Sequence, residues 1–479
     1  MVKPRHVVAT LGSGADLALR QGVQFAALLV LARILSPRDF GTVALLALFV
    51  SFATVIADLG LTTALVRAPS LTAPEVSTAF WMSAATGASL TVLGLLLAHP
   101  IATAVGAPEL GNLAAVMSCG IVVAALGVAP TALLVKQLAF ARLLVIGATG
   151  ATISGAVAIA MAVAGQGVWA LAAQSLVMSV VTALGAWIAV GFWPHRAWSP
   201  DAARRLLGTG KFVLAANICD VSYSRIQNLL VGSLFGPARL AYYLRADSTQ
   251  QLPADAASSV ISRVALPVFS ESGDNAVALR NGLRTSIRTA VALNAPAMSL
   301  LAALSAPVVE ALYGAAWAPA APLLTILCLG GLLWPLHVLN INLLYALGRS
   351  REVFRIDLQK KAFALCALGV GATFGLTGVA WAQVATGVFA IVVNGHAVGG
   401  QIGFGTKDQL GCAWAPISLS LVVGVAVFGA TRLLHTTALT EVATLALLGG
   451  LAYLALSRIL AVSAVTEAVA MLRIRGAHS

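Results

Sequence analysis

The chain has 479 residues, of which 59% are hydrophobic and only 10% are charged, whereas soluble globular domains carry about 25% charged residues. This composition excludes a soluble protein, because no soluble core needs so much apolar surface. The net charge of +12 does not indicate a nucleic-acid-binding protein, because the sequence lacks a basic patch interleaved with aromatic residues.

Apolar runs of about 20 residues, the length that crosses a ~30 Å hydrocarbon layer, repeat from one end of the chain to the other. We therefore predict an all-α, polytopic membrane protein with about fourteen transmembrane helices. In chain order the predicted spans are 14–35, 40–62, 76–98, 110–134, 143–164, 167–193, 210–235, 240–268, 286–306, 318–346, 354–374, 377–402, 411–430 and 439–461.

The basic residues give these predicted helices an orientation. If the amino terminus lies in the cytoplasm, most of the 29 Lys and Arg residues fall at cytoplasmic ends of the spans, and few fall at the opposite ends. Such a bias is typical of membrane proteins, whose cytoplasmic loops carry the positive charge. We therefore expect both termini in the cytoplasm, with the positive charge acting as an orientation signal and attracting anionic lipid.

A short motif recurs in the two halves of the chain. The first predicted span ends in Pro37-Arg-Asp-Phe-Gly41, and the seventh ends in Pro237-Ala-Arg-Leu-Ala241. Pro and Gly are common in turns, but here the turn follows the equivalent span of each half. We interpret this as a duplication, in which residues 1–197 and 198–403 form two six-helix lobes related as parallel repeats, with the substrate site between them.

Polar and ionisable residues concentrate in the first two predicted spans of each half. They recur every three or four residues, which places them on one face of each helix. The four stripes are Ser13, Asp16, Arg20 and Gln24; Ser51, Thr54, Asp58 and Thr62; Asn217, Asp220, Ser224, Gln227 and Asn228, with Arg225 at the margin; and Arg245, Ser248, Gln251, Asp255, Ser259 and Ser262.

Hydrocarbon cannot solvate such faces, so each polar group must meet water or another polar group. One interpretation is that the groups satisfy one another and hold the helices together, Asp16 with Arg20 for instance. We favour a water-filled cleft between the lobes, lined by the two striped spans of each half. Hydrogen-bonded contacts between helices do not need so many ionisable groups.

The remaining polar residues within the spans are isolated along the sequence. We expect core or cap roles for them: His337, Asn340, Asn342, Gln383, Asn394 and His396. The histidines have no metal-binding spacing, and the chain carries no P-loop, nucleophile elbow or other motif of soluble enzymes. We therefore expect no metal site, no cofactor and no enzymatic activity.

Four segments together resemble one family of membrane proteins. They are LARILSPRDFGTVAL (31–45), IADLGLTTALVR (56–67), FGPARLAYYLRADSTQQLP (235–253) with RVALPVFSE (263–271), and VVEALYGAAWAPAAPLLTIL (308–327). The most specific piece is Tyr243-Leu-Arg-Ala246 followed by Leu252-Pro253. Over about residues 10–400 the chain resembles the polysaccharide exporters of the colanic-acid-exporter (Wzx-like) type, within the multidrug/oligosaccharidyl-lipid/polysaccharide (MOP) superfamily.

The resemblance implies a flippase that moves undecaprenyl-diphosphate-linked oligosaccharide repeat units across the bacterial cytoplasmic (inner) membrane by alternating access, for exopolysaccharide, capsule or O-antigen synthesis. It implies that the striped spans line a central cavity and that the last two spans, within residues 404–479, lie outside the two lobes. The expected partners are the lipid-linked oligosaccharide, membrane lipids, and a polysaccharide polymerase with its export machinery. Nucleic acid is not an expected partner.

For such a substrate, arginines suit the diphosphate, because a guanidinium stays ionised and forms bidentate hydrogen bonds with phosphate oxygens. The candidates for this role are Arg20, Arg225, Arg245 and Arg263. Neutral amides suit the sugar hydroxyls, and the candidates are Gln24, Asn217, Asn228 and Gln251. Five aspartates in or near the stripes have two alternative roles. One is to bind Na⁺ or exchange a proton; the other, which we favour, is to neutralise and orient the arginines. They are Asp16, Asp58, Asp220, Asp247 and Asp255.

Other functions stay open. A drug or cation antiporter of the same superfamily would favour an acidic cleft over one with several arginines, and a lipid II flippase would share the fold. A polytopic glycosyltransferase or polymerase needs a substantial extracytoplasmic loop with catalytic groups, whereas the predicted loops are short. A scaffold role without transport is also consistent with the sequence.

Overall fold

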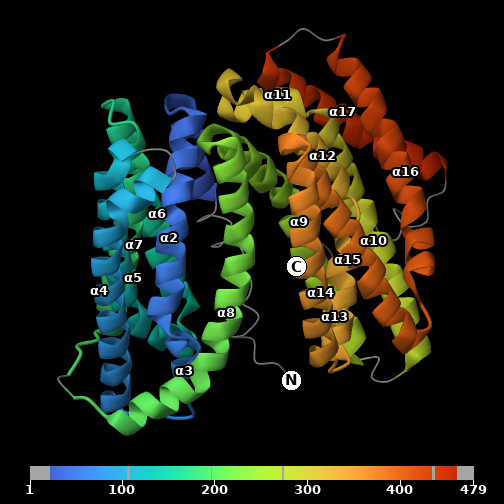
Figure 1. Cartoon of the computed structure of the whole chain (residues 1–479). Coiled ribbons are helices and arrows are strands. Elements are labelled where there is room, and N and C mark those ends of the chain that lie inside the picture. The colour runs from blue at the N-terminus through green and yellow to red at the C-terminus, as the bar shows by residue number, and fades with distance from the viewer. Residues whose placement is uncertain (1–21, 105–107, 196, 272–274, 434–436, 461–479) are drawn as a thin grey trace. The chain divides into compact units, whose positions relative to one another are not determined.

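The computed structural model describes residues 22–104, 108–195, 197–271, 275–433 and 437–460 (Figure 1). Within these ranges the chain is helical and contains no β-strand. The predicted all-α class is therefore confirmed. The chain divides into two compact units, Met1–Ala241 and Tyr242–Ser479.

The N-terminal unit is built from long helices that pack side by side. Helix α4 packs against α5, α6 packs against α7, and α5 also packs against α7 (Figure 1). A short apolar helix, Gly22–Ile34, precedes these elements. In chain order they are α2 (Pro37–Asp58), α3 (Leu61–Arg67), α4 (Ala73–Ala104), the 3₁₀ turn η1 (Pro108–Leu110), α5 (Gly111–Lys136), α6 (Phe140–Val163), α7 (Val168–Val190), α8 (Pro200–Phe235) and the start of α9 (Pro237–Glu271).

Local sequence determines where α2 and α8 begin. The Ser36 side chain accepts a hydrogen bond from the backbone N–H of Asp39, and Asp39 Oδ2 accepts one from the backbone N–H of Ser36 at 3.0 Å. These two bonds form a capping box. Pro37 at the first helical position also favours the helix start, because its ring fixes φ near the helical value. Helix α8 starts in the same way, because Ser199 accepts from the Ala202 N–H and Pro200 follows.

The predicted span 40–62 is broken in the structure. Helix α2 ends at a left-handed pair, Leu59 with φ 52° and Gly60 with φ 70°, and α3 follows directly. A Cβ added to Gly60 would overlap the carbonyl of Gly210 in α8, and one added to Gly210 would overlap the carbonyl of Leu59. The break therefore lets the backbones of the span and of α8 touch.

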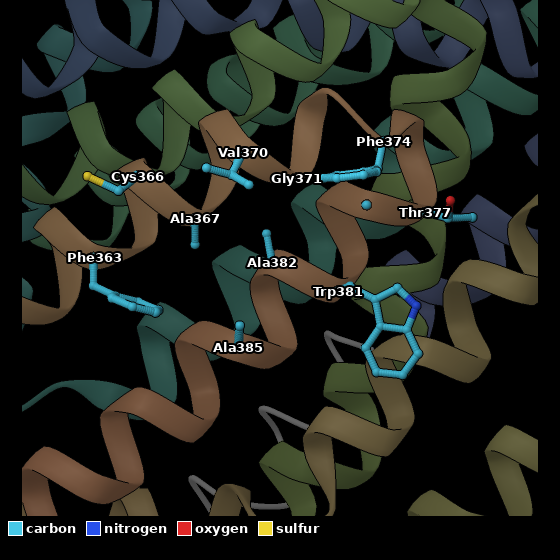
Figure 2. Close-up of a pocket in the computed structure, with 11 residues that line it drawn as sticks. Phe363, Cys366, Ala367, Val370, Gly371, Phe374, Thr377, Trp381, Ala382 and Ala385 are labelled. Atoms are coloured by element: carbon cyan, nitrogen blue, oxygen red, sulfur yellow. The ribbon is translucent and has the colours of Figure 1, made fainter.

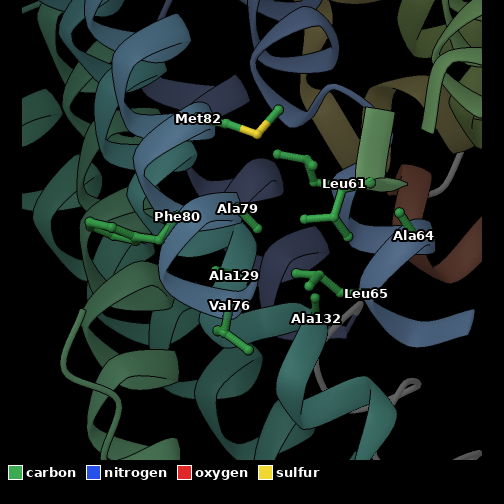
Figure 3. Packing of buried hydrophobic residues seen from close by; sticks show 10 residues of the cluster. Leu61, Ala64, Leu65, Val76, Ala79, Phe80, Met82, Ala129 and Ala132 are labelled. Carbon is green, nitrogen blue, oxygen red and sulfur yellow. The ribbon is translucent and has the colours of Figure 1, made fainter. Parts of the chain in front are cut away.

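An apolar core holds the break in place. Leu61 and Leu65 of α3 pack against Phe80 of α4, Ala129 of α5 and Leu206 of α8, in a cluster of buried side chains (Figure 3). Lipid is as apolar as these side chains, so close van der Waals packing is the main favourable term where these helices meet inside the membrane.

The two copies of the repeated motif contact each other within the N-terminal unit. Pro37 opens α2 and Pro237 opens α9, so the copies hold equivalent positions at the start of a helix. A Cβ at Gly41, the last residue of the first copy, would overlap the carbonyl of Pro237, the first residue of the second. The small residue in the motif thus permits a close helix contact.

The C-terminal unit holds two bent helix pairs. Helices α10 and α11 meet at 77°, and the segment Ala315–Gly331 meets α13 at 44°. Helix α10 packs against α16, and α15 packs against both α12 and α14. After α9 the elements are α10 (Ala276–Ala303), α11 (Ser305–Tyr313), η2 (Ala315–Ala320), α12 (Ala321–Gly331), α13 (Trp334–Ala346), α14 (Ser350–Ala372), α15 (Gly375–Ile402), α16 (Thr406–Thr431) and α17 (Ala438–Ile459).

The boundary between the two compact units lies inside α9, after Ala241. The predicted lobe boundary lies earlier, at 197/198. The two differ because α8 packs against α2, α3 and α4, which precede it in the chain. The predicted boundaries describe membrane topology, which such contacts do not test. They stay a prediction.

Within the described ranges, eight helices are long and apolar enough to cross a membrane, or up to 10 if each bent pair is one span. The chain is therefore a multi-pass membrane protein. The predicted spans 210–235, 240–268 and 354–374 form α8, α9 and α14, but these helices are too polar to meet the same criterion. The full number of spans stays a prediction.

Candidate functional site

Five candidate side chains lie outside the described part of the chain. Asp16 and Arg20 precede residue 22. Asp220, Asp255 and Arg263 belong to the described helices α8 and α9, but their side chains are not described. The roles predicted for these five residues stay predictions.

Helix α8 is long enough to cross a membrane, yet its middle is not packed into a core. Its 36 residues extend about 54 Å at 1.5 Å per residue. No described residue between Lys211 and Leu230 is buried. Asn217 is exposed on this stretch, and Asn228 is half-buried. A helix with polar groups on an unpacked surface cannot lie in hydrocarbon alone, so this stretch requires water or another polar surface.

Arg225 lies on the same stretch of α8 and is half-buried. Its Nε atom is buried and has no hydrogen-bond partner among the described residues. A guanidinium offers only donors and no acceptor, so this N–H needs an oxygen that the described chain does not supply. An anionic ligand oxygen would suit it.

Helix α9 has one packed face and one open face in the C-terminal unit. Tyr243, Ala246 and Thr249 are buried, while Gln251 is exposed. Gln251 Nε2 donates a hydrogen bond to Asp247 Oδ2 at 2.7 Å, one turn earlier. Gln251, a candidate for binding sugar hydroxyls, and Asp247, a candidate acid, are therefore hydrogen-bonded to each other on the open face.

Arg245 lies on α9 beside a buried hydroxyl pair. Thr249 Oγ1 donates to the Arg245 carbonyl at 2.7 Å and lies 2.8 Å from the Tyr313 hydroxyl. The Trp317 ring lies 5.8 Å from the Tyr313 ring and 6.0 Å from the Tyr242 ring. The segments 235–253 and 308–327, which carry the family resemblance, therefore pack together around this arginine.

The polar stripe of the second predicted span is satisfied within its own helices. Ser51 donates to the Ala47 carbonyl at 2.7 Å, and Thr54 donates to the Ser51 carbonyl at 2.9 Å. Asp58 Oδ1 accepts from both the backbone N–H and the hydroxyl of Thr62. The carboxylate thus caps α3 across the break, a local role that needs no bound ion. Gln24, on the helix before α2, is exposed.

Two of the candidate diphosphate-binding arginines have described side chains, and they belong to different units. Arg225 lies in the N-terminal unit and Arg245 in the C-terminal unit.

Asn394 is buried in the core, as expected, and it contacts His337 of another helix. Asn394 Nδ2 of α15 lies 2.8 Å from His337 Nδ1 of α13, in a side-chain hydrogen bond whose donor depends on the imidazole tautomer. On the neighbouring α14, Asp357 pairs with Lys360 at 3.3 Å and with Lys361 at 2.9 Å. The spacing of these three charges on one helix was visible in the sequence. Contact between residues 337 and 394 was not, because it depends on how three helices pack.

An open apolar groove of about 660 Å³ lies between α14 and α15 (Figure 2). Phe363, Cys366 and Val370 line it from α14, Phe374 lines it from the turn before α15, and Trp381 lines it from α15. The lining contains no charged side chain. The groove therefore suits a hydrocarbon chain and does not match the diphosphate site.

Comparison with known proteins gives one family and several relatives. A family profile described as polysaccharide biosynthesis protein matches residues 30–322. The succinoglycan biosynthesis transport protein ExoT of Rhizobium meliloti is 29% identical over 359 residues, which cover 74% of this chain and 72% of the relative. The lipopolysaccharide biosynthesis protein WzxC of Escherichia coli is 23% identical, with 84% and 82% covered. The teichuronic acid biosynthesis protein TuaB of Bacillus subtilis is 24% identical, with 79% of each chain covered.

Two solved structures share the fold. The lipid II flippase MurJ in its inward closed conformation gives a TM-score of 0.71 at 15% identity, with 94% of this chain and 98% of that chain covered. An inward-facing multidrug resistance MATE family transporter of the MOP superfamily gives a TM-score of 0.61 at 16% identity, with 83% and 96% covered. At these identities the similarity concerns the fold alone.

Proposed function

Because the chain belongs to the family of polysaccharide biosynthesis proteins, we propose that it is a flippase for undecaprenyl-diphosphate-linked oligosaccharide repeat units. It moves them from the inner to the outer leaflet of the bacterial cytoplasmic membrane, for exopolysaccharide, capsule or O-antigen synthesis. The relatives named for succinoglycan, lipopolysaccharide and teichuronic acid synthesis support a polysaccharide precursor as the cargo.

The observation that carries this proposal is the polar, unpacked middle of α8. A headgroup with a diphosphate and several sugars cannot cross hydrocarbon unaided, so its carrier needs a hydrated passage. A membrane-length helix with Asn217, Arg225 and Asn228 on a stretch where none of the described side chains is buried supplies one wall of such a passage. The open face of α9, with Asp247 and Gln251, supplies further polar groups.

The proposed topology has fourteen spans, both termini in the cytoplasm, and two parallel lobes at residues 1–197 and 198–403, followed by a C-terminal helix pair. Alternating access then exposes the passage to each side of the membrane in turn, as substrate binding shifts the population of states. A polymerase that joins the flipped units is a proposed partner on the far side.

Within the passage, we assign the diphosphate to arginines and the sugars to amides. A lipid diphosphate carries about two negative charges, and bidentate guanidinium contacts replace the water that these charges lose. The buried Arg225 Nε without an acceptor among the described residues supports this assignment. The acids keep the arginines neutralised and oriented.

The similarity to a protein named for transport favours a transporter over a polytopic glycosyltransferase or polymerase. A drug or cation antiporter and a lipid II flippase are the alternatives within the same fold. The curated relatives favour the polysaccharide substrate over both.

The test uses a strain in which this gene is deleted and surface polysaccharide is measured. Arg225→Ala and Arg245→Ala, at matched protein level, should lower the yield about tenfold or more, since each removes a charge-assisted contact. Arg225→Lys keeps the charge but loses the bidentate geometry of the guanidinium, and it should give an intermediate polysaccharide yield. Arg432→Ala, an exposed arginine at the end of α16, is the control. Wild-type yield in both alanine variants would remove the diphosphate assignment.

A further inference from the structure

The predicted span 318–346 is broken in its middle, and the proposed passage does not use the break. Helix α12 ends at Gly331 and α13 begins at Trp334, and the segment before the break meets α13 at 44°. Pro335 lies at the start of α13 and has no N–H group. The Gly331 carbonyl, four residues earlier, therefore lacks the donor that a continuous helix would give it, which accounts for the bend.

One side chain of a neighbouring helix replaces the missing donor. Asn294 of α10 is buried, and its Nδ2 donates to the Gly331 carbonyl at 2.9 Å and to the Leu332 carbonyl at 3.4 Å. Both partners are carbonyl oxygens, which only accept, so the amide nitrogen must face them. Asn294 Oδ1 has no hydrogen-bond partner among the described residues. A buried acceptor without a donor is costly, so this asparagine contributes through the bridge from its Nδ2.

Helix α10 is itself braced by the last two helices. Pro296 inside α10 removes the N–H donor of the Ala292 carbonyl, and the hydroxyl of Tyr453 on α17 donates to that carbonyl at 3.1 Å. One turn further along α10, the Ser299 hydroxyl donates to the Ser420 carbonyl of α16 at 2.7 Å. These bonds fix α10 to α16 and α17, so the broken span is bridged to a helix that is held in place.

The break also contacts α9, the helix that carries Arg245 and Gln251. A Cβ added to Gly331 would overlap Gln250 Nε2 of α9 and Met298 Sδ of α10. Gln250 Nε2 lies 3.8 Å from Met298 Sδ. Glycine at the break therefore makes room for a side chain of α9, and a change in the bend would displace the residue next to Gln251.

We propose that the break between α12 and α13 is a hinge of the C-terminal unit that moves with α9 during transport, an inference that rests on the proposed function. Asn294 is the positioning residue that holds the bent state. A bend whose carbonyls are bound by a side chain of another helix can open and close without unfolding a helix. A headgroup bound on α9 shifts the bend through Gln250, since a ligand acts through its different contacts with the two states.

Thermal unfolding in detergent tests the bridge without any substrate. Pro335→Ala gives the Gly331 carbonyl a backbone donor, so Asn294→Leu should lower the melting temperature less in the Pro335→Ala chain than in the wild type. The expected difference between the two backgrounds is about 2 °C, the worth of one hydrogen bond. Equal losses in both backgrounds would overturn the bridge.

Asn340→Leu is the matched control for this comparison. Asn340 is also a fully buried asparagine whose Oδ1 has no partner among the described residues, but its amide bonds to Gln409 of α16 and not to the break. Asn340→Leu should lower the melting temperature by the same amount with and without Pro335→Ala. A dependence on Pro335 as large as that of Asn294→Leu would contradict a bridge specific to Asn294.

Movement of the hinge is tested in the deletion strain, at matched protein level. Pro335→Ala favours the straight helix and should lower the surface polysaccharide about tenfold or more, while the melting temperature stays the same or rises. A role in stability alone would not give a loss of yield in a chain that is as stable as the wild type. Gln250→Ala, which removes the contact of α9 with the break, should lower the yield in the same way.

The outcomes separate the hinge from the proposed function. Wild-type yield or a lower melting temperature in Pro335→Ala would contradict the hinge, and wild-type yield in Gln250→Ala would contradict its coupling to α9. If even the wild type fails to restore the polysaccharide, the proposed function fails, while the melting temperatures still test the Asn294 bridge.

Discussion

The buried hydroxyl pair of Thr249 and Tyr313 lies next to Arg245, the arginine of the most specific motif of the sequence. The pair joins α9 to α11, and Thr249 also bonds the Arg245 carbonyl. The motif therefore fixes the position of the arginine through packing and one side-chain hydrogen bond between helices. Tyr242, which precedes the motif, joins the same cluster through its ring contact with Trp317.

Thr249→Val and Tyr313→Phe should each lower the free energy of unfolding by about 1 kcal/mol, because each leaves one buried hydroxyl without its partner. The double variant should cost less than the sum, since both changes remove the same bond. Comparative thermal unfolding in detergent measures this. Thr373→Val, an exposed threonine bonded to its own helix, is the control. Strict additivity would contradict the pairing.

At this scale the sequence predicted which residue types gather on one helical face, because a period of three or four residues is a local property. It did not predict their partners. Asp58 was a candidate for ion coupling, and its carboxylate accepts from Thr62 in the next turn. The His337–Asn394 contact was missed for the complementary reason: it links positions 57 residues apart.

Among the elements, the crossing of α8 over the break between α2 and α3 depends on two glycines. Gly60 has a left-handed φ of 70°, and its backbone touches that of Gly210. The contact is one of several that hold α8 on the N-terminal unit, with Leu206 in the apolar core and Gly232 against Leu45.

Gly210→Ala should destabilise the N-terminal unit by about 2 kcal/mol or more, because the added methyl meets backbone that has no room to move. Gly208→Ala, on the same helix with nothing within 4 Å of the added methyl, should be neutral or slightly stabilising. Protein yield and melting temperature of the two variants measure the difference. Equal melting temperatures would contradict a tight crossing.

The positions of most elements followed from hydropathy. The predicted spans 110–134 and 377–402 correspond to α5 (Gly111–Lys136) and α15 (Gly375–Ile402), because each is an apolar run bounded by turn residues. The breaks at residues 59–60 and 332–333 were not predicted, because both lie inside continuous apolar runs. α8 and α9 form long helices although their hydropathy is too low for the membrane-span criterion. Both carry candidate site residues.

For the whole molecule, the family and the all-α membrane fold follow from segments spread over both units. Three helices, α8, α9 and α14, are too polar for hydrocarbon alone. For α8 and α9, which carry the candidate site residues, a hydrated route for a polar headgroup is the economical explanation. Which glycan travels along that route depends on contacts that the sequence pattern does not encode.

Cysteine accessibility along α8 tests this hydrated route most directly. Asn217→Cys and Asn228→Cys are introduced singly into a chain without its five native cysteines, and intact membranes are treated with a charged, membrane-impermeant thiol reagent. Native Cys366 alone, in the apolar groove, and Val425→Cys, 72% exposed on α16, report the reactivity of lipid-facing positions. The account predicts rapid labelling at both α8 positions and none at the two controls. Labelling of the α8 positions no faster than that of Cys366 would contradict it.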